Sequence, residues 1–129
     1  VYELQEYVVT IIHKKAFKKS NISKVIFEED SALEIIDDEA FMLTSIISIV
    51  IPSHVKRIGK KSFFCCLKLF SLSFSDDSEL RIIDEEAFGS TKLKKFKLPQ
   101  SVEVIKDCFC ESYPKVTSLT IVPKNWITK

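Results

Sequence analysis

One spacing rule governs the whole sequence. A six-residue pattern, apolar-x-x-apolar-x-apolar, occurs five times, and its last positions are 24, 23, 24 and 23 residues apart. Units this short cannot bury their own apolar residues and gain stability only by stacking on their neighbours. The repeat therefore predicts a coil of stacked turns. The apolar positions are Ile22, Val25, Phe27; Ile46, Ile49, Ile51; Leu69, Leu72, Phe74; Leu93, Phe96, Leu98; and Val116, Leu119, Ile121.

A second pattern alternates with the first. It reads apolar-x-x-Ile and then a small residue followed by Phe, and its fifth copy is one residue short. An aromatic in every turn could line a ligand site, but a ring that recurs at one register is typical of a core column. We therefore predict a segment that starts as a short strand, ends in a single helical turn and closes the core with its Phe. The copies are Val9, Ile12, Ala16, Phe17; Leu33, Ile36, Ala40, Phe41; Val55, Ile58, Ser62, Phe63; Leu80, Ile83, Ala87, Phe88; and Val102, Ile105, Cys108, Phe109.

The end of the first pattern has the period of a β-strand. Val25 and Phe27 would point inward and Ile26 outward, which is an alternation of two. Strands repeated in each turn would lie ~4.8 Å apart in a parallel sheet with right-handed connections. The sequence thus predicts one domain, 1–129, coiled right-handed in about five turns, with a parallel β-sheet on its concave side. The turns span approximately 8–32, 33–54, 55–79, 80–101 and 102–123.

A longer period of two turns is superimposed on the first. Phe27 and Phe74 are 47 residues apart, as are Ile51 and Leu98. Odd turns leave their strand through a long acidic segment, 28–32 or 75–79, whereas even turns leave through a short proline segment. Proline fixes φ and donates no hydrogen bond, so it naturally ends a strand. The duplicated unit is therefore predicted to be two turns of the coil.

The pattern I-x-x-x-A-F with a following small residue, as in Ile12, Ala16, Phe17 and Ser20, resembles the BspA-like leucine-rich repeats. The likeness runs over about 8–123. The sequence departs from the family in two ways. The Gly that frequently follows Ile in the family is present only at Gly59, and the fifth repeat is shortened. The resemblance implies a leucine-rich-repeat solenoid, carried in long arrays on surface proteins of anaerobic bacteria and parasitic protists. It also implies binding to host proteins or other cells, at the cell surface or after secretion.

The outward positions of the predicted concave sheet are the candidate contact surface. In solenoids such a face is the usual binding surface. These positions carry small hydroxyls, lysines and an exposed apolar pair, a mixture that suits a protein ligand such as a host matrix or cell-surface protein. The alternative, that these side chains merely solvate the sheet, stays open. The candidate residues are Lys24, Ile26, Ser48, Val50, Ser71, Ser73, Lys95, Lys97, Ser118 and Thr120.

The triplets that follow each Ile of the second pattern alternate in charge. They are basic at 13–15 and 59–61 and acidic at 37–39 and 84–86. Adjacent turns would therefore place opposite charges side by side, as cross-strand pairs do in a sheet. The acidic triplets lack the ligand spacing of a calcium loop. We predict a structural charge ladder and no metal site.

Composition and motifs argue against several other functions. The 19 Lys and Arg balance 18 acidic residues, so the basic excess of a nucleic-acid-binding chain is missing. Two glycines leave little scope for phosphate-binding loops, no serine sits in a Gly-x-Ser-x-Gly motif, and His13 and His54 fall in different columns. No apolar run is long enough to cross a bilayer. We predict a protein that is not an enzyme and uses no cofactor.

Two functional hypotheses follow. The first is a cell-surface adhesion or recognition module, and the second is an intracellular scaffold that recruits a partner protein. A signal peptide or membrane span in the parent protein would favour the first. The chain begins with Val and is expected to be a piece of a longer array. Leftover apolar residues at its ends, Tyr2, Leu4, Trp126 and Ile127, also predict weak end-to-end association.

Overall fold

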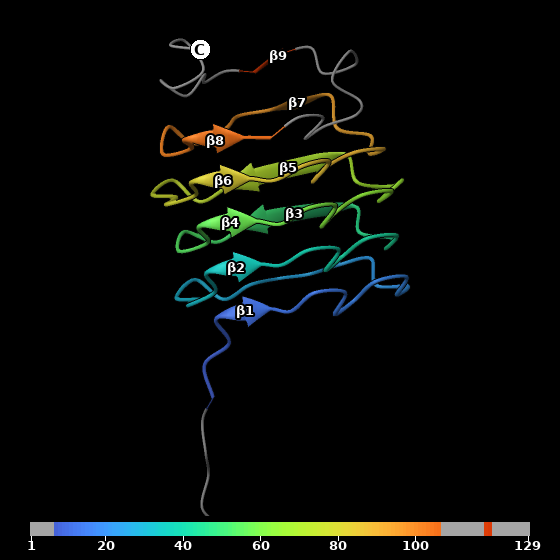
Figure 1. Ribbon diagram of the computed structural model, residues 1–129, viewed down its shortest axis with the longest axis horizontal. Coiled ribbons are helices and arrows are strands. Elements are labelled where there is room, and N and C mark those ends of the chain that lie inside the picture. The colour runs from blue at the N-terminus through green and yellow to red at the C-terminus, as the bar shows by residue number, and fades with distance from the viewer. Residues whose placement is uncertain (1–6, 107–117, 120–129) are drawn as a thin grey trace, which may run out of the picture.

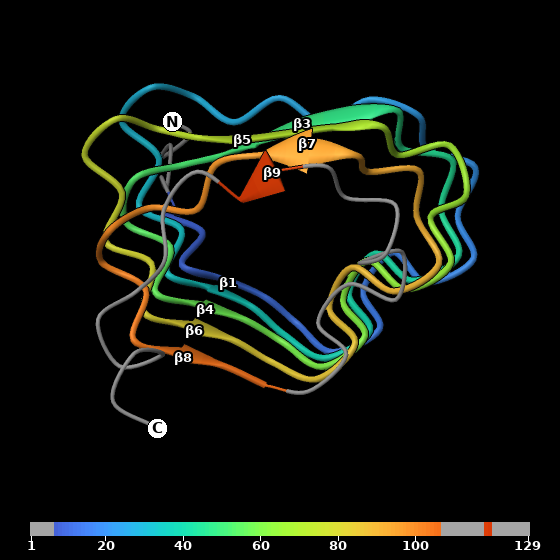
Figure 2. The same ribbon diagram turned by 90° about the horizontal axis from the view of Figure 1, so that it is seen from above.

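The computed structural model describes residues 7–106 and 118–119. The chain forms a stack of flattened turns (Figure 1). Strands of one wall run left to right at the front, strands of the other wall run right to left behind them, and the chain climbs one level with each pass. Seen from above, the two walls face each other across the core (Figure 2). This sense of winding makes the coil right-handed, as predicted.

The front wall is a continuous parallel sheet of five short strands in the order β1-β2-β4-β6-β8. It is made by the second pattern, and its register aligns the second residue of each strand, from Ile12 and Ile36 to Ile105. Five passes through this wall enclose four complete turns of the about five that the sequence predicts. The strands are β1 (Ile11–Ile12), β2 (Ile35–Ile36), β4 (Arg57–Ile58), β6 (Ile82–Ile83) and β8 (Val104–Ile105).

The rear wall is made by the first pattern. Its strands are β3 (Ser48–Ile51), β5 (Ser71–Phe74), β7 (Lys95–Phe96) and β9 (Ser118–Leu119). The parallel pairs are β3 with β5 and β7 with β9, and Lys24 of the first turn bridges to Ser48. The predicted inward–outward alternation is confirmed in β3, where exposed and buried residues alternate. However, the continuous sheet lies on the other wall from the one predicted, and the rear sheet is divided into two pairs.

The corner that follows each front strand differs from the expected helical turn. The N–H groups of Ala16, Lys18 and Ser20 donate to carbonyl oxygens three residues earlier in the same turn. The intervening N–H groups of Lys15, Phe17 and Lys19 donate to carbonyl oxygens of the next turn of the coil, at 2.8–3.0 Å. A helix would keep every N–H bond inside its own segment. Each corner is therefore a series of β-turns tied sideways to its neighbour.

The backbone of these corners has a regular special conformation. Two residues in each corner, four apart, have positive φ, for example Lys15 at 61° and Lys19 at 64°. Non-glycine residues adopt this left-handed region at some cost in free energy. The sideways hydrogen bonds between corners hold the backbone in place and offset that cost. The other residues with positive φ are Glu39, Leu43, Lys61, Cys65, Glu86 and Ser90.

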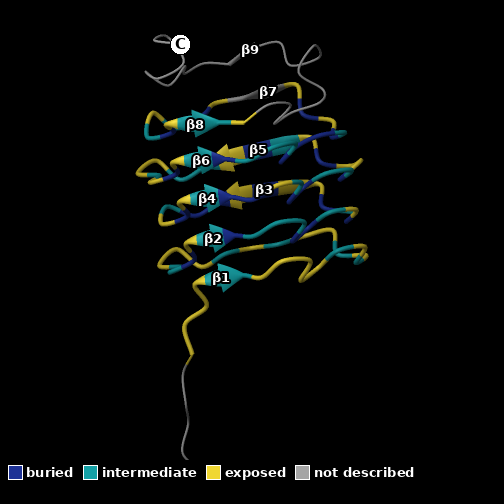
Figure 3. Ribbon diagram, in the orientation of Figure 1, coloured by how far each residue is buried: buried dark blue, intermediate teal, exposed yellow. Residues whose placement is uncertain are grey.

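The core lies between the two walls and at the corner (Figure 3). The predicted Phe column is confirmed as part of it. Phe17, Phe41, Phe63 and Phe88 stack in sequence with 5.2 Å between successive ring centroids and interplanar angles of 6–14°. The last three rings are buried, whereas Phe17 at the end of the column is 41% exposed. The largest buried aliphatic residues are Leu33, Ile36, Ile46, Ile51, Ile58, Leu69, Leu80, Ile83 and Leu93.

Candidate protein-binding surface

The rear wall carries the residues that the sequence nominates for binding. Of these, Lys24, Ile26, Ser48, Val50, Ser73 and Lys97 are exposed on its outer side and Ser71 is half-buried. Lys95 and Ser118 lie in strands of the same wall, but their side chains are not among those described. Thr120 lies outside the described residues. The strand geometry thus brings the described candidates to one face of the molecule.

The same wall also exposes large apolar residues that sequence reasoning missed. Phe70 is 60% exposed, and Ile47 is exposed beside it, since the Phe70 N–H donates to the Ile47 carbonyl oxygen at 3.0 Å. Leu67, in the turn that precedes β5, is also 60% exposed. The sequence already hinted at this exposure. Ile47 and Phe70 occupy the second position of the six-residue pattern, and the inward–outward alternation of the strand does not predict whether that position is buried or exposed. Contiguous exposed apolar side chains mark interaction sites. The apolar strip of the rear wall is Ile26, Ile47, Val50 and Phe70.

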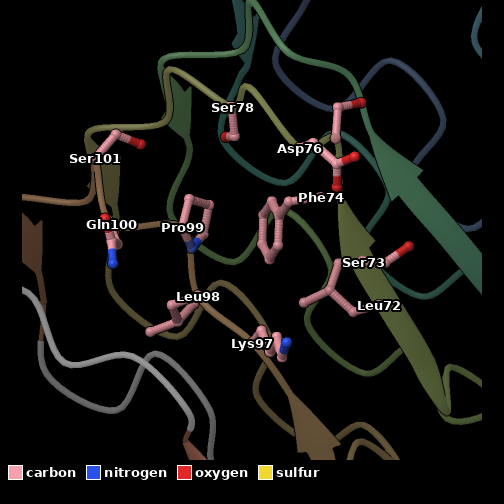
Figure 4. Close-up of a pocket in the computed structure, with 11 residues that line it drawn as sticks. Leu72, Ser73, Phe74, Asp76, Ser78, Lys97, Leu98, Pro99, Gln100 and Ser101 are labelled. Carbon is pink, nitrogen blue, oxygen red and sulfur yellow. The ribbon is translucent and has the colours of Figure 1, made fainter.

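Two hollows open at the edge where the rear strands end. The larger, about 540 Å³, lies at the exits of β5 and β7. Figure 4 shows the ring of Phe74 beside Pro99, with Asp76 and Ser78 at one rim and Lys97 at the other. The smaller, about 380 Å³, lies between the first turn and β3. Its lining residues are Lys24, Val25, Ile26, Phe27, Glu28, Glu29, Ser48, Ile49, Val50, Pro52 and Ser75.

The charged residues of the front side form a network centred on Arg57 of β4. The guanidinium Nη1 lies 3.2 Å from Oδ1 of Asp37, and Nη2 lies 2.8 Å from Oδ1 of Asp38 and 3.0 Å from Oδ2 of Asp84. One arginine therefore links carboxylates of the turns below and above its own. The charge ladder predicted from the triplets exists in part, since Lys60 pairs with Glu85 at 3.7 Å. Its principal cation, however, is Arg57, which the triplets do not include.

Local hydrogen bonds favour the ionised forms of Asp37 and Asp84. The backbone N–H of Asp38 donates to Asp37 at 2.7 Å and, with Arg57 and against the effect of burial, lowers the pKa of Asp37. Burial alone would raise the pKa of Asp84, but the N–H of Glu85 and the Arg57 guanidinium together lower it. Burial likewise opposes the charge of Arg57, yet the three carboxylates raise its pKa. The network is thus a set of fixed ion pairs that clamps three turns together.

Gly59 makes room for this clamp. A β-carbon at this position would lie 2.7 Å from the carbonyl carbon of Asp37 and 2.7 Å from both the nitrogen and Oδ1 of Asp38. That Oδ1 accepts the backbone N–H of Lys60 at 2.9 Å as well as the Arg57 guanidinium. Any side chain at position 59 would displace the neighbouring turn or its carboxylate. This packing explains why position 59 is a glycine.

Two groups that could serve catalysis, His54 and Cys66, are held in structural contacts. His54 pairs with Glu79 at 3.0 Å, which ties a proline turn to the adjacent long turn. Cys66 is buried, burial raises the pKa of its thiol, and its Sγ donates to the Phe41 carbonyl oxygen at 3.1 Å. A raised pKa disfavours the thiolate, which is the nucleophilic form. Within residues 7–106 and 118–119, no three His, Cys, Asp or Glu side chains are grouped so as to hold a metal ion.

A right-handed parallel coil with a stacked Phe column is a leucine-rich-repeat solenoid. The chain belongs to the BspA-type leucine-rich-repeat family, whose repeat region matches residues 7–127 in six copies. Repeats of this type are protein-interaction modules. In the part of the chain that the structure describes, no helix has the length and apolar character needed to traverse a bilayer.

A solved structure shares the fold at appreciable sequence identity. The crystal structure of the pneumococcal vaccine antigen PcpA superposes with a TM-score of 0.73 and is 36% identical in sequence. The match covers 75% of the present chain but 24% of that chain, so this protein corresponds to about a quarter of the length of PcpA. No curated protein matches the sequence.

Proposed function

We propose that this chain is a cell-surface adhesion or recognition module that binds a protein ligand through the outer face of its rear wall. The apolar strip is the observation that carries the proposal. Ile26 and Val50 are neighbours in adjacent turns, and so are Ile47 and Phe70. Burying an exposed side chain of this size contributes ~1.5–3 kcal/mol, so two such pairs can supply the core of an interface.

Polar residues around the strip would supply specificity. Interfaces combine a central apolar cluster with a hydrogen-bonding rim. The hydroxyls and lysines of the rear wall suit that role, and those whose side chains are described lie on the same face as the strip. On the front wall the corresponding outward column is interrupted by Arg57, whose guanidinium is engaged by three carboxylates. The proposed rim residues are Lys24, Ser48, Ser71, Ser73, Lys95, Lys97, Ser118 and Thr120.

A location at the cell surface follows from the same proposal. Its support is family membership and the likeness to PcpA, which is a vaccine antigen. A host matrix or cell-surface protein is the ligand that such a location favours. A signal peptide or surface anchor in the parent protein supports this location, whereas a parent protein retained inside the cell supports the scaffold hypothesis.

Two substitutions in the apolar strip test the proposal. Val50→Asp and Phe70→Asp each place a charge on an exposed position, so the fold should tolerate them. Each should weaken binding to immobilised host matrix proteins or whole cells by about tenfold or more, because burying an unpaired carboxylate is costly. Biolayer interferometry with purified ligands, together with flow cytometry on cells, measures the change.

Leu43→Asp is the matched control, because Leu43 is 39% exposed but lies in a corner of the coil and not on the rear wall. It should bind as the unmodified protein does. Circular dichroism of all three variants checks that the fold is intact. If the unmodified protein binds no matrix protein or cell, or if the three substitutions weaken binding equally, the rear wall is not the contact surface.

We also propose that the isolated chain associates weakly end to end. Tyr7, Val8 and Val9 are exposed where the coil starts, and Phe17 ends the Phe column with one face uncovered. A second coil stacked there would extend the column. The apolar residues nominated from the sequence, Tyr2, Leu4, Trp126 and Ile127, lie outside the described residues. Light scattering across a dilution series should show a mean mass that rises with concentration, and a constant monomer mass would refute the association.

A further inference from the structure

The two hollows of the rear wall are copies of one site, related by the 47-residue repeat. Each contains a half-buried phenylalanine, Phe27 or Phe74, and each is bordered by the proline of a short turn, Pro52 or Pro99. The equivalent position beside the strand is Val25 in one hollow and Leu72 in the other. Further matched pairs are Ile26 with Ser73, Glu28 with Ser75, Glu29 with Asp76 and Val50 with Lys97.

The alternation of long and short turns creates this arrangement. The short proline turn at 52–54 lies between the long turns at 28–32 and 75–79, so the edge of the coil recedes at every second level. Ser75 lines both hollows, and its N–H donates to the Ile51 carbonyl oxygen at 3.1 Å. The two hollows therefore adjoin at Ser75, one above the other along the coil axis, and we call the pair the axial groove.

The spacing of the hollows selects a ligand conformation. One hollow lies between the first and second passes of the rear wall and the other between the third and fourth, so they are two strand steps, or ~9.6 Å, apart. A polyproline II helix rises ~3.1 Å per residue with three residues per turn, so its side chains return to one face every ~9.3 Å. A β-strand returns to one face every ~6.7 Å, which does not match.

The chemistry of the axial groove fits the same ligand. Proline-rich peptides dock in aromatic-lined grooves in other recognition domains, and each hollow here contains a phenylalanine ring. The turn side of the hollows carries exposed carboxylates, Glu28 and Glu29 on one long turn and Asp76 on the next, whereas one lysine, Lys24 or Lys97, lies on the strand side of each hollow. These carboxylates favour basic side chains on the ligand.

We propose that the axial groove binds a basic, proline-rich peptide segment in the polyproline II conformation, with apolar side chains three residues apart seated over Phe27 and Phe74. This inference rests on the proposed protein-binding function and names the class of ligand segment. The ligand runs along the coil axis and spans four turns. Each two-turn unit of the coil contributes one hollow and contacts one turn of the peptide helix.

Labelled synthetic peptides test the spacing and the charge. The probes are lysine- and proline-rich peptides that contain two leucines either three or two residues apart, and a copy of the first in which glutamate replaces lysine. Fluorescence anisotropy should show the three-residue spacing binding about tenfold more tightly than the two-residue spacing, because only the former seats both leucines. The glutamate peptide should lose binding. Equal affinities for the two spacings, or no binding by any peptide, would overturn the inference.

A pair of serine substitutions distinguishes peptide binding in the axial groove from the proposed protein binding by the rear wall. Ser73→Trp fills the larger hollow, whereas Ser23→Trp adds the same bulk to an exposed position that lines neither hollow. Only Ser73→Trp should reduce peptide affinity, by about tenfold. If peptides fail to bind while a matrix protein still binds and is lost with Phe70→Asp, the axial groove is disproved and the proposed function stands.

Discussion

Replacing Phe63 by alanine should destabilise the protein by about 3–5 kcal/mol. Phe63 is fully buried, and its ring is stacked between those of Phe41 and Phe88 at 5.2 Å on each side. The cavity left by its removal cannot close, because each neighbouring ring is fixed by its own corner and by hydrogen bonds between corners. Urea denaturation followed by circular dichroism measures the loss.

The position of Phe63 should also affect cooperativity. In a solenoid each turn contacts only its neighbours, so stability is a sum of turn and interface terms. Weakening the interfaces of the middle turn separates the turns before it from those after it. We therefore expect the unfolding transition of Phe63→Ala to broaden as well as to shift to lower urea.

Phe17→Ala is the matched control, because Phe17 belongs to the same column but is 41% exposed and has one stacking partner. It should cost about 1 kcal/mol, since less apolar area is lost and the space is open to solvent. Phe63→Leu should recover much of the lost stability. Equal losses for Phe17→Ala and Phe63→Ala would contradict the expectation that a buried ring with two stacking partners stabilises the fold more than an exposed ring with one.

The sequence predicts the core well because the core repeats. The small-residue and Phe columns, for instance Ala40 with Phe41 and Ala87 with Phe88, are buried as expected. The corner geometry could not be predicted in the same way. An Ala-Phe pair after an Ile is compatible with a helical turn, and the hydrogen bonds that replace the helix join two different turns. The positive φ at Lys15 and Glu39 leaves no mark in the sequence, because neither position is a glycine.

The candidate surface illustrates the opposite case. Comparing equivalent positions of the repeats reveals residue types that recur, and it gives little weight to a residue type that occurs at only one of those positions. Phe70 stands in a column with Ser23 and Ile47, and its exposure follows only from the strand geometry of the rear wall. Arg57 stands in an outward column otherwise filled by Ile and Val. Both residues therefore depart from the repeat. Phe70 is exposed on the rear wall, and Arg57 forms three ion pairs on the front side.

Replacing Arg57 by alanine should destabilise the protein by about 2–4 kcal/mol. Hydrogen bonds to charged groups contribute ~1.5–3 kcal/mol each when well formed, and Arg57 makes three to carboxylates that are partly exposed, which reduces each contribution. Its removal also leaves Asp37, Asp38 and Asp84 close together without their common cation. Both effects weaken the clamp across three turns.

Arg81→Ala is the matched control on the next front strand level. Arg81 forms an exposed pair with Glu103 at 2.8 Å, and exposed pairs contribute ~0.2–1 kcal/mol. Arg57→Lys should lose most of the stability as well, because an ammonium group cannot span three carboxylates as the planar guanidinium does. Similar losses for Arg57→Ala and Arg81→Ala would mean that the clamp is no stronger than a surface ion pair.

Acid should remove the contribution of Arg57. The folded protein holds the pKa of Asp37 and Asp84 below the ordinary value of 3.8. Groups with a lowered folded pKa stabilise the fold above the unfolded pKa, and this stabilisation is lost as the pH falls through the folded pKa. The difference in free energy of unfolding between the unmodified protein and Arg57→Ala should therefore be complete at neutral pH and shrink below about pH 4. Urea titrations at neutral and acid pH measure that difference. A difference that does not change with pH would assign the effect to packing of the Arg57 aliphatic stem rather than to its charge.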